Sequence, residues 1–269
     1  MSAVNVSPWL DRLETACGKV SASCLYLIID QAGSDAPLLP SVISIQPPMR
    51  WYSLFTGLPE EGLQDIAPLL VQVDLAQLLQ RQWLIGLMHH LHGKSQLLAL
   101  VSHWPFLTLA QHLSRCLNAR NKGGRGLLRY YDPRIFGLLF SHVLEPEQQQ
   151  AWKYPAEFWS WLDLDGSPLM LAGESESPEC VDSFSPIELS DAQLNTLFCA
   201  SDAFRFIGEL GPELPSGWSA EKRFQSCYAA MLEATRIGLL CDDDRYTFTL
   251  DVCLTPEGAL ALNQGQSHA

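Results

Sequence analysis

The chain has little charge and no long apolar run. Charged residues make up 17% of its 269 residues, below the quarter that is usual in globular proteins, whereas hydrophobic residues make up 47%. No apolar stretch reaches the roughly 18 residues that a membrane-spanning helix needs. Met1 to Trp9 has no basic start and no apolar centre, so it does not resemble a secretory signal. These absences predict a soluble protein with a well-packed core and no membrane partner.

Paired cysteine motifs are also missing. The eight cysteines stand singly at positions 17, 24, 116, 180, 199, 227, 241 and 253, and no CxxC occurs. Scattered thiols of this kind fit a reducing compartment better than a disulfide framework. The expected location is therefore the cytoplasm.

Positive charge is scarce in the second part of the chain. Residues 1–150 hold 11 basic and 11 acidic residues, whereas residues 151–269 hold 6 and 19, which accounts for the net charge of −13. Such asymmetry suggests two units with different surfaces. It disfavours nucleic acid or an anionic membrane as the partner. The simpler alternative is an acidic surface that only aids solubility.

The first part of the chain alternates strand-like and helix-like segments. This alternation predicts an α/β fold with helices packed on a mainly parallel sheet, because continuous apolar runs are typical of buried parallel strands. The expected strands are Leu25–Ile29, ending at Asp30, then Arg50–Phe55, Leu69–Val73 and Leu97–Val101, and the expected helices are Leu75–Leu91 and Phe106–Leu117. Residues 118–126 are glycine-rich and basic, which predicts a flexible loop.

A polar stretch from Asp163 to Pro186 predicts the domain boundary, with an α/β lobe at 1–165 and a smaller, acidic, mainly helical lobe at 166–269. In the second lobe we expect Ser190 to cap one helix and a second helix to cover Ser219–Leu239. A short strand near Tyr246–Leu250 and a final turn from Pro256 complete the expected lobe.

The most informative motif spans Gly126 to Ile135, with the sequence GLLRYYDPRI. Apolar and aromatic residues predict a short buried strand that breaks into a helix. Asp132 can accept hydrogen bonds from the open N–H groups of that helix, and Pro133 suits the first helical position. Asp30, Tyr131, Asp132 and Pro133 are therefore predicted to be structural, and Arg134 partly so.

This motif resembles the signature of the DUF4123 family, in which an aromatic-rich strand runs into Asp-Pro-Arg. The resemblance covers roughly Leu25 to Trp161 and includes Tyr26–Asp30, Ser53–Gly57 and Ala67–Val71. It departs at Glu147–Trp152, where a phenylalanine-glycine-proline-like turn is expected. The family is found in adaptor, or chaperone, proteins of bacterial type VI secretion systems. The resemblance therefore implies an adaptor that binds a toxic effector protein and loads it onto the spike protein VgrG. The unmatched residues 162–269 would then vary with the cargo.

Catalytic and metal-binding patterns are weak. His89, His90 and His92 cluster near a helix end, but no Cys or acid pair stands nearby to complete a zinc site. No GxSxG elbow and no GxxxxGK[ST] loop occur. We therefore expect no catalytic residue, metal or cofactor. The competing hypothesis is an α/β hydrolase-like enzyme of unknown substrate.

Candidate partner-binding residues fall into two groups. The only concentrated basic region holds Arg115, Arg120, Lys122, Arg125, Arg129 and Arg134, which is either a solvated loop or a docking patch for an acidic protein surface. From this region Arg125, Arg129, Tyr130 and Arg134 are predicted to contact the partner. In the second lobe aromatic residues amid acids are predicted to read the cargo, although each could instead fill the core: Phe204, Phe206, Trp218 and Phe224.

Overall fold

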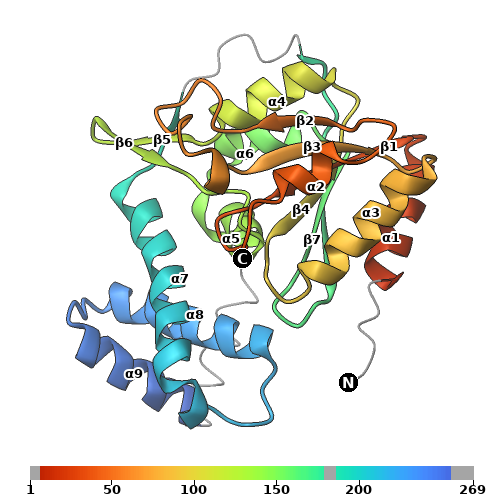
Figure 1. Ribbon diagram of the computed structural model, residues 1–269. Coiled ribbons are helices and arrows are strands. Elements are labelled where there is room, and N and C mark those ends of the chain that lie inside the picture. Colours follow the sequence, from red (N-terminus) through yellow and green to blue (C-terminus); the bar gives the residue numbers. More distant parts are fainter. Residues whose placement is uncertain (1–6, 179–185, 256–269) are drawn as a thin grey trace. The chain divides into compact units, whose positions relative to one another are not determined.

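The computed structural model describes residues 7–178 and 186–255. It divides into two compact units (Figure 1). The first comprises residues 1–137 and 145–188, and the second comprises residues 138–144 and 189–269, within the described ranges. The first unit thus extends beyond the predicted boundary at residue 165, and the second takes one short segment from the middle of the chain.

A six-stranded sheet forms the centre of the first unit, in the order β2-β3-β1-β4-β7-β8. Four of its strands lie at the predicted segments, whereas those at Phe158–Leu162 and Pro168–Ala172 were not predicted. The inner strands bury side chains on both faces of the sheet, and the edge strands are partly exposed. The bounds are β1 (Cys24–Ile29), β2 (Arg50–Ser53), β3 (Leu69–Asp74), β4 (Leu97–Val101), β7 (Phe158–Leu162) and β8 (Pro168–Ala172). The two helices predicted at Leu75–Leu91 and Phe106–Leu117 also form, over Leu78–His90 and Phe106–Arg115.

The prediction of a mainly parallel sheet is wrong, because every neighbouring pair in this sheet is antiparallel. Helices do connect strands that run in the same direction, as the alternation suggested. Those strands are two positions apart, however: β3 and β4 both pair with β1, and β1 and β2 both pair with β3. An oppositely directed strand fills each gap.

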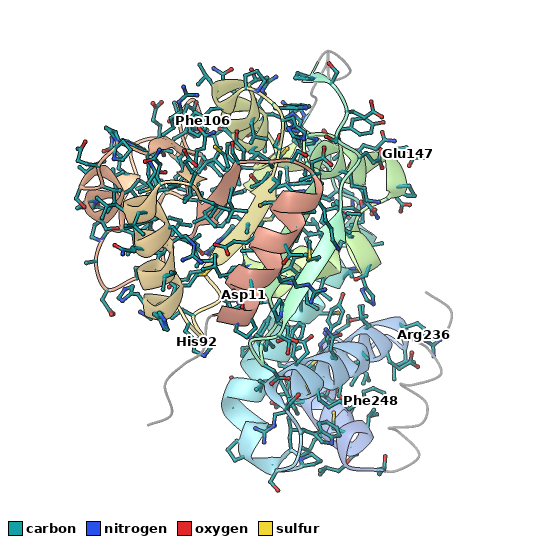
Figure 2. The ribbon with its side chains drawn as sticks, turned by 90° about the vertical axis from the view of Figure 1, so that its right-hand side faces the viewer. Asp11, His92, Phe106, Glu147, Arg236 and Phe248 are labelled. Carbon is teal, nitrogen blue, oxygen red and sulfur yellow. The ribbon has the colours of Figure 1, made fainter. Side chains whose placement is uncertain are left out.

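Helices cover both faces of the sheet, which explains why its inner antiparallel strands β1 and β4 are continuous apolar runs. On one face Leu27 lies opposite Val71 and Ala99 in the register, and all three join a core with α1 (Ser7–Lys19), α2 (Leu39–Ile43) and α3 (Leu78–His90). The Trp9 indole also donates a 2.9 Å hydrogen bond to Ser160 Oγ on β7. Asp11 lies on the outer, exposed face of α1 (Figure 2).

The other face is covered by α4 (Phe106–Arg115), α5 (Pro133–Leu138) and α6 (Pro146–Lys153). Tyr26 on β1 stacks on Phe106 at 6.3 Å between ring centroids, and Phe136 packs against Trp159 at 5.0 Å. In both contacts an aromatic side chain of the sheet packs against an aromatic side chain of a covering helix. A 3₁₀ turn, η1 (Gln64–Ile66), connects β2 and β3.

The predicted loop at 118–126 is instead a β-hairpin of β5 (Asn118–Asn121) and β6 (Gly124–Leu127). Its two central residues, Lys122 and Gly123, have φ of 47° and 84°. Positive φ at both positions is the requirement of a type I′ turn, whose twist suits a two-residue hairpin. With the short strand β9 (Ile187–Glu188), which pairs in parallel with β5, the hairpin forms a second sheet in the order β6-β5-β9.

The second unit is helical, as predicted. It contains the π-helix η2 (Leu139–Val143), α7 (Asp191–Leu210), the 3₁₀ turn η4 (Gly211–Glu213), α8 (Ala220–Arg236) and α9 (Asp242–Leu254). Ser190 accepts a hydrogen bond from Gln193 N, which confirms its predicted cap, and Ser219 accepts one from Lys222 N at the start of α8, where the second helix was predicted to begin. Figure 2 shows Arg236 at the end of α8 and Phe248 on α9.

The predicted strand near Tyr246–Leu250 is wrong, because this segment belongs to α9. Arg245, Thr249 and Cys253, spaced four residues apart, are buried on one face of the helix. The guanidinium of Arg245 donates hydrogen bonds to Thr235 Oγ1 at 2.8 Å and Asp202 Oδ2 at 3.1 Å. In this segment the burial of one helix face therefore outweighs the local preference of its residues for a strand. The turn expected from Pro256 lies outside the described residues.

Among residues 7–178 and 186–255, no helix has both the length and the apolar character needed to cross a membrane.

Candidate functional site

An aspartate at the end of β1 meets an arginine of the GLLRYYDPRI motif. Asp30 follows Ile29 directly, and its side chain is only 7% exposed. Asp30 Oδ2 accepts a hydrogen bond from Arg129 Nη2 at 2.8 Å, while its Oδ1 accepts one from Ala32 N at 3.0 Å. The backbone of Asp30 is fixed as well, because Gln96 Nε2 donates to its carbonyl at 2.8 Å. A buried carboxylate is thus neutralised by a guanidinium that stays 47% exposed.

The two tyrosines of the motif face different surroundings. Tyr130 is fully buried, donates a 3.0 Å hydrogen bond to the carbonyl of Leu113, and packs edge-on against Trp152 at 5.5 Å. Tyr131 lies beneath Arg129, whose guanidinium carbon is 5.6 Å from the ring centroid. Burial raises the pKa of Tyr131 to about 12, against a smaller opposing effect of Arg129. Its phenol therefore stays protonated at neutral pH.

Asp132 begins α5 as the sequence predicts. Its Oδ1 accepts a hydrogen bond from Arg134 N at 3.0 Å, and its carbonyl accepts from Phe136 N at 2.9 Å, so it caps the helix that starts at Pro133. The carboxylate of Asp132 also accepts hydrogen bonds from the guanidinium of Arg134. Arg134 Nε donates to Oδ1 at 2.9 Å, and Nη2 donates to Oδ2 at 2.7 Å. This hydrogen bonding, more than the opposing desolvation, raises the pKa of Arg134.

Two carboxylates and two guanidinium groups thus lie together, and we call Asp30, Arg129, Asp132 and Arg134 the charged cluster. Its charges balance. The carboxylates are buried and bound by arginines, whereas about half of each guanidinium side chain is exposed. The Asp30–Arg129 pair therefore links the end of β1 to the segment before α5, and both arginines present guanidinium surface outward. Neither carboxylate is poised as a general base, because each already binds a cation.

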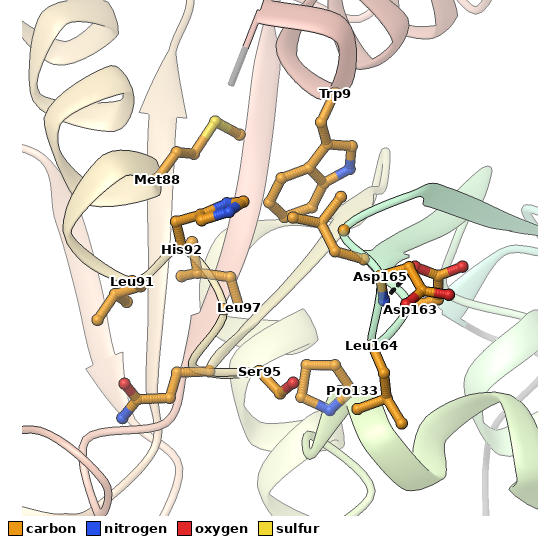
Figure 3. A pocket seen from close by; sticks show the side chains of 14 residues that line it. Trp9, Met88, Leu91, His92, Ser95, Leu97, Pro133, Asp163, Leu164 and Asp165 are labelled. Carbon is orange, nitrogen blue, oxygen red and sulfur yellow. Dashed lines mark hydrogen bonds between the residues drawn. The ribbon is translucent and has the colours of Figure 1, made fainter. Parts of the chain in front are cut away.

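A small cavity of about 130 Å³ lies beside the motif (Figure 3). Its wall is mixed: apolar side chains such as Trp9, Met88 and Leu97 alternate with the polar side chains of His92, Ser95 and Gln96. Asp163 and Asp165 belong to its rim, where Asp163 Oδ1 accepts a 2.9 Å hydrogen bond from Asp165 N. In Figure 3 both carboxylates point away from Trp9 and His92. The polar groups therefore diverge rather than converge on one bound atom.

The comparisons with known proteins add one finding. Residues 25–151 match the family model described as Domain of unknown function (DUF4123). The chain contains a DUF4123 domain. No curated protein and no solved structure matches the chain. The match confirms the family resemblance, and it begins within β1, ends within α6 and includes the whole charged cluster. The family's description assigns no activity, and residues 152–269 lie outside the match.

Within the DUF4123 domain, the histidines at the end of α3 do not form a metal centre. His89, His90 and His92 are exposed, and no group of three or more His, Cys, Asp or Glu able to hold a metal ion occurs in the described ranges. A different histidine is structural: His112 on α4 is buried, with Nε2 2.6 Å from the carbonyl oxygen of Ala151. Burial lowers the pKa of His112, so its ring is neutral and donates this hydrogen bond.

The predicted partner-binding residues of the DUF4123 domain differ in exposure. Arg125 on β6, Arg129 and Arg134 are exposed, whereas Tyr130 is buried and can influence a surface only by positioning Arg129. Trp152 packs against Tyr130 but was not among the predicted site residues, because no local sequence pattern links two residues this far apart. Partner contact by these residues stays a prediction.

Outside the DUF4123 match, the four predicted cargo-reading aromatics lie in the second unit. Phe206 and Phe224 are buried, and Phe204 is half-buried with its ring stacked on Phe224 at 4.3 Å. Trp218 is half-buried beneath Lys222 Nζ, 5.6 Å from its ring centroid. The buried rings fill the core of the helical unit. Among residues 189–255 of this unit, the large apolar side chains that stay exposed are Phe198, Ile237, Leu240 and Leu254.

Proposed function

We propose that the chain is a non-enzymatic adaptor that binds a type VI secretion effector and helps to load it onto the VgrG spike protein. The observation that carries this proposal is the DUF4123 match across residues 25–151. The link from this family to adaptors of that secretion system is the one that the sequence resemblance implies. The adaptor acts in the cytoplasm, where effectors are loaded, and its partners are proteins rather than nucleic acid or membrane.

The geometry of the charged cluster supports an adaptor over a hydrolase. Asp30 and Asp132 are each bound to an arginine, and Tyr131 has a pKa of about 12, so these groups do not serve as a general base at neutral pH. In the cavity beside Pro133 the carboxylates of Asp163 and Asp165 point away from His92, the titratable side chain on the opposite wall. Half-exposed arginines over a rigid scaffold instead suit recognition of a protein surface.

The acidic, helical second unit is the cargo-reading part of this proposal. Its exposed apolar side chains include Phe198, 60% exposed, and Leu240, 89% exposed. Acidic residues flank them, for example Asp202 on α7 and Asp242 to Asp244 at the start of α9. Apolar anchors within a polar surround are typical of protein interfaces. We infer that the effector covers this surface, while the DUF4123 domain holds a partner region shared among effectors.

Genomic neighbourhood and co-purification test the proposal together. The tagged full chain is co-expressed with the effector and VgrG candidates encoded beside it, and each mixture is analysed by size-exclusion chromatography with light scattering. We expect a stoichiometric complex with one neighbouring effector. Deleting the chain's gene should then remove that effector from the secreted fraction while VgrG is still secreted. Secretion of the effector at its normal level without the chain would refute the adaptor role.

A further inference from the structure

Two arginines face each other across the β5–β6 hairpin. Arg120 and Arg125 are register partners in this antiparallel pair, so their side chains leave the same face of the hairpin with Cβ atoms about 5 Å apart. Like charges directly opposite each other destabilise a strand pair. In the described part of the chain neither side chain has an ion pair or a side-chain hydrogen bond. The hairpin therefore carries a pair of like charges that form no ion pair with a carboxylate of the described residues, although Glu188 of β9 lies opposite Arg120 on the other side of β5.

Both arginines line one cavity of about 180 Å³. Gly57, Pro59, Asn118 and Pro186 form its other walls. This volume has room for a carboxylate or phosphate group with a few waters. Two arginines that line one space can each offer a forked pair of N–H donors, which suits the binding of a carboxylate or phosphate.

The walls of the cavity are fixed before any ligand arrives. Ser114 Oγ on α4 donates hydrogen bonds to the carbonyls of Leu54 and Thr56, at 2.7 Å and 3.2 Å, which hold the loop that leads to Gly57. The hairpin is held on one side by β9 and at its base by the 2.8 Å hydrogen bond from Leu128 N to the carbonyl of Leu117. A preformed site of this kind loses little entropy when it binds.

The outer strand of the hairpin offers an open backbone edge. β6 pairs with β5 on one side, and among the described residues no strand covers its other side. Arg125 stands between Gly124 and Gly126, and a Cβ placed on Gly126 would meet no atom within 4 Å. In Figure 1 the hairpin projects from the side of the first unit. An extended peptide can therefore hydrogen-bond to this edge without displacing side chains.

We propose that the β6 edge binds an extended acidic segment of the protein partner, with one Asp or Glu carboxylate held between Arg120 and Arg125. The segment adds a strand to the sheet β6-β5-β9, and its alternate side chains fall on the arginine face because a strand repeats every two residues. This inference rests on the proposed function, because it takes the partner to be a protein.

Charge favours a short acidic segment over a nucleic acid. The first unit holds 12 basic and 19 acidic residues, so a long polyanion meets repulsion beyond the hairpin. A single carboxylate needs only the two arginines. Phosphate alone has the same local chemistry and is therefore one arm of the test.

The test uses the full chain and a short fluorescein-labelled peptide of alternating threonine and glutamate, with a threonine–glutamine peptide as the uncharged probe. Binding is followed by fluorescence anisotropy. We expect the glutamate peptide to bind, the glutamine peptide not to bind, and Arg120→Gln or Arg125→Gln to weaken binding about tenfold, as loss of one charge-assisted hydrogen bond predicts. Arg115→Gln is the matched control: it removes an exposed arginine of the same basic region that does not line the cavity, and it should change affinity less than about twofold.

Several results would overturn the inference. Equal binding of both peptides, unchanged affinity in both hairpin variants, or binding of inorganic phosphate without binding of the peptide would each do so. The melting temperature of the free protein supplies a second readout. Arg125→Gln should leave it unchanged or raise it, because the substitution relieves like-charge repulsion. A large fall would make the pair structural and would contradict the proposal.

The inference and the proposed function fail separately. If the neighbouring effector co-purifies with the wild type and equally with Arg120→Gln and Arg125→Gln, the adaptor role stands and the edge site is wrong. If the peptide binds through these arginines but no neighbouring protein co-purifies, the edge site stands and the adaptor role is wrong.

Discussion

Replacing Asp132 with alanine should destabilise the first unit by about 2 kcal/mol. Loss of the helix cap accounts for about 1 kcal/mol, since Asp132 Oδ1 accepts the hydrogen bond of Arg134 N. Loss of the contact with the guanidinium of Arg134, whose side chain is 44% exposed, adds up to about 1 kcal/mol after solvent screening. The purely local pattern of the sequence suggests only the first of these contributions.

Urea denaturation followed by tryptophan fluorescence measures this loss where it occurs. Seven of the eight tryptophans belong to the first unit, and only Trp218 lies in the second, so the signal reports mainly on the first unit. Arg134→Ala is the control that removes the ion pair and keeps the cap, and it should cost about 1 kcal/mol or less. Equal losses in the two variants would show that the cap contributes nothing. An unchanged stability in Asp132→Ala combined with lost partner binding would refute the structural reasoning altogether.

Two further predictions concern packing and protonation in the first unit. Gly173→Ala should cost about 3 kcal/mol or more, because the new Cβ would lie 1.8 Å from the carbonyl oxygen of Ala156, whereas Gly126→Ala meets no atom within 4 Å and should cost little by the same urea assay. Burial lowers the pKa of His112, so the folded state binds fewer protons than the unfolded state, whose histidine has a pKa of about 6.5. Stability should therefore fall as the pH drops below about 6.5, and His112→Gln should flatten this dependence in melting temperatures measured across that range. An unaltered slope in the variant would contradict the assignment.

The positions of the strands could be predicted from the sequence, but their directions could not. Leu25–Ile29 and Leu97–Val101 are continuous apolar runs because both faces of the sheet are covered by helices. Coverage on both faces produces the same pattern in parallel and antiparallel sheets. The helices between β1 and β2 and between β3 and β4 also connect strands that run in the same direction, as the sequence alternation predicted. The information that was missing is the placement of β1 between β3 and β4, which depends on pairing between distant segments.

The hairpin and the last helix were missed for opposite reasons. The turn at Lys122–Gly123 is a local signal that was available, but its glycine-rich surroundings indicated a loop. In α9 the local signal favoured a strand, and the deciding feature is the buried face formed by Arg245, Thr249 and Cys253. The four-residue spacing of these positions was visible in the sequence. The burial of an arginine among them was not.

Half of the charged cluster was accessible to sequence reasoning. Asp132 and Arg134 belong to one helix start, where capping rules apply directly. Asp30 was recognised as structural, but its partner Arg129 lies 99 residues away in the sequence. Likewise the facing of Arg120 and Arg125 requires the hairpin register, which a loop assignment cannot supply.

The second unit takes residues 138–144, which contain its π-helix, from the interior of the chain, between two segments of the first unit. The polypeptide consequently passes from one unit to the other three times, and no single cut separates them. A chain shortened after Glu188 would keep Leu139 and Val143 but lose α7, whose Gln193 Nε2 donates a 2.7 Å hydrogen bond to the carbonyl of Val143. Such a fragment would expose apolar surface and tend to aggregate. Loss of binding in a truncated chain would then report damage rather than a missing recognition surface, so the roles of the two units are best separated by point substitutions in the intact protein.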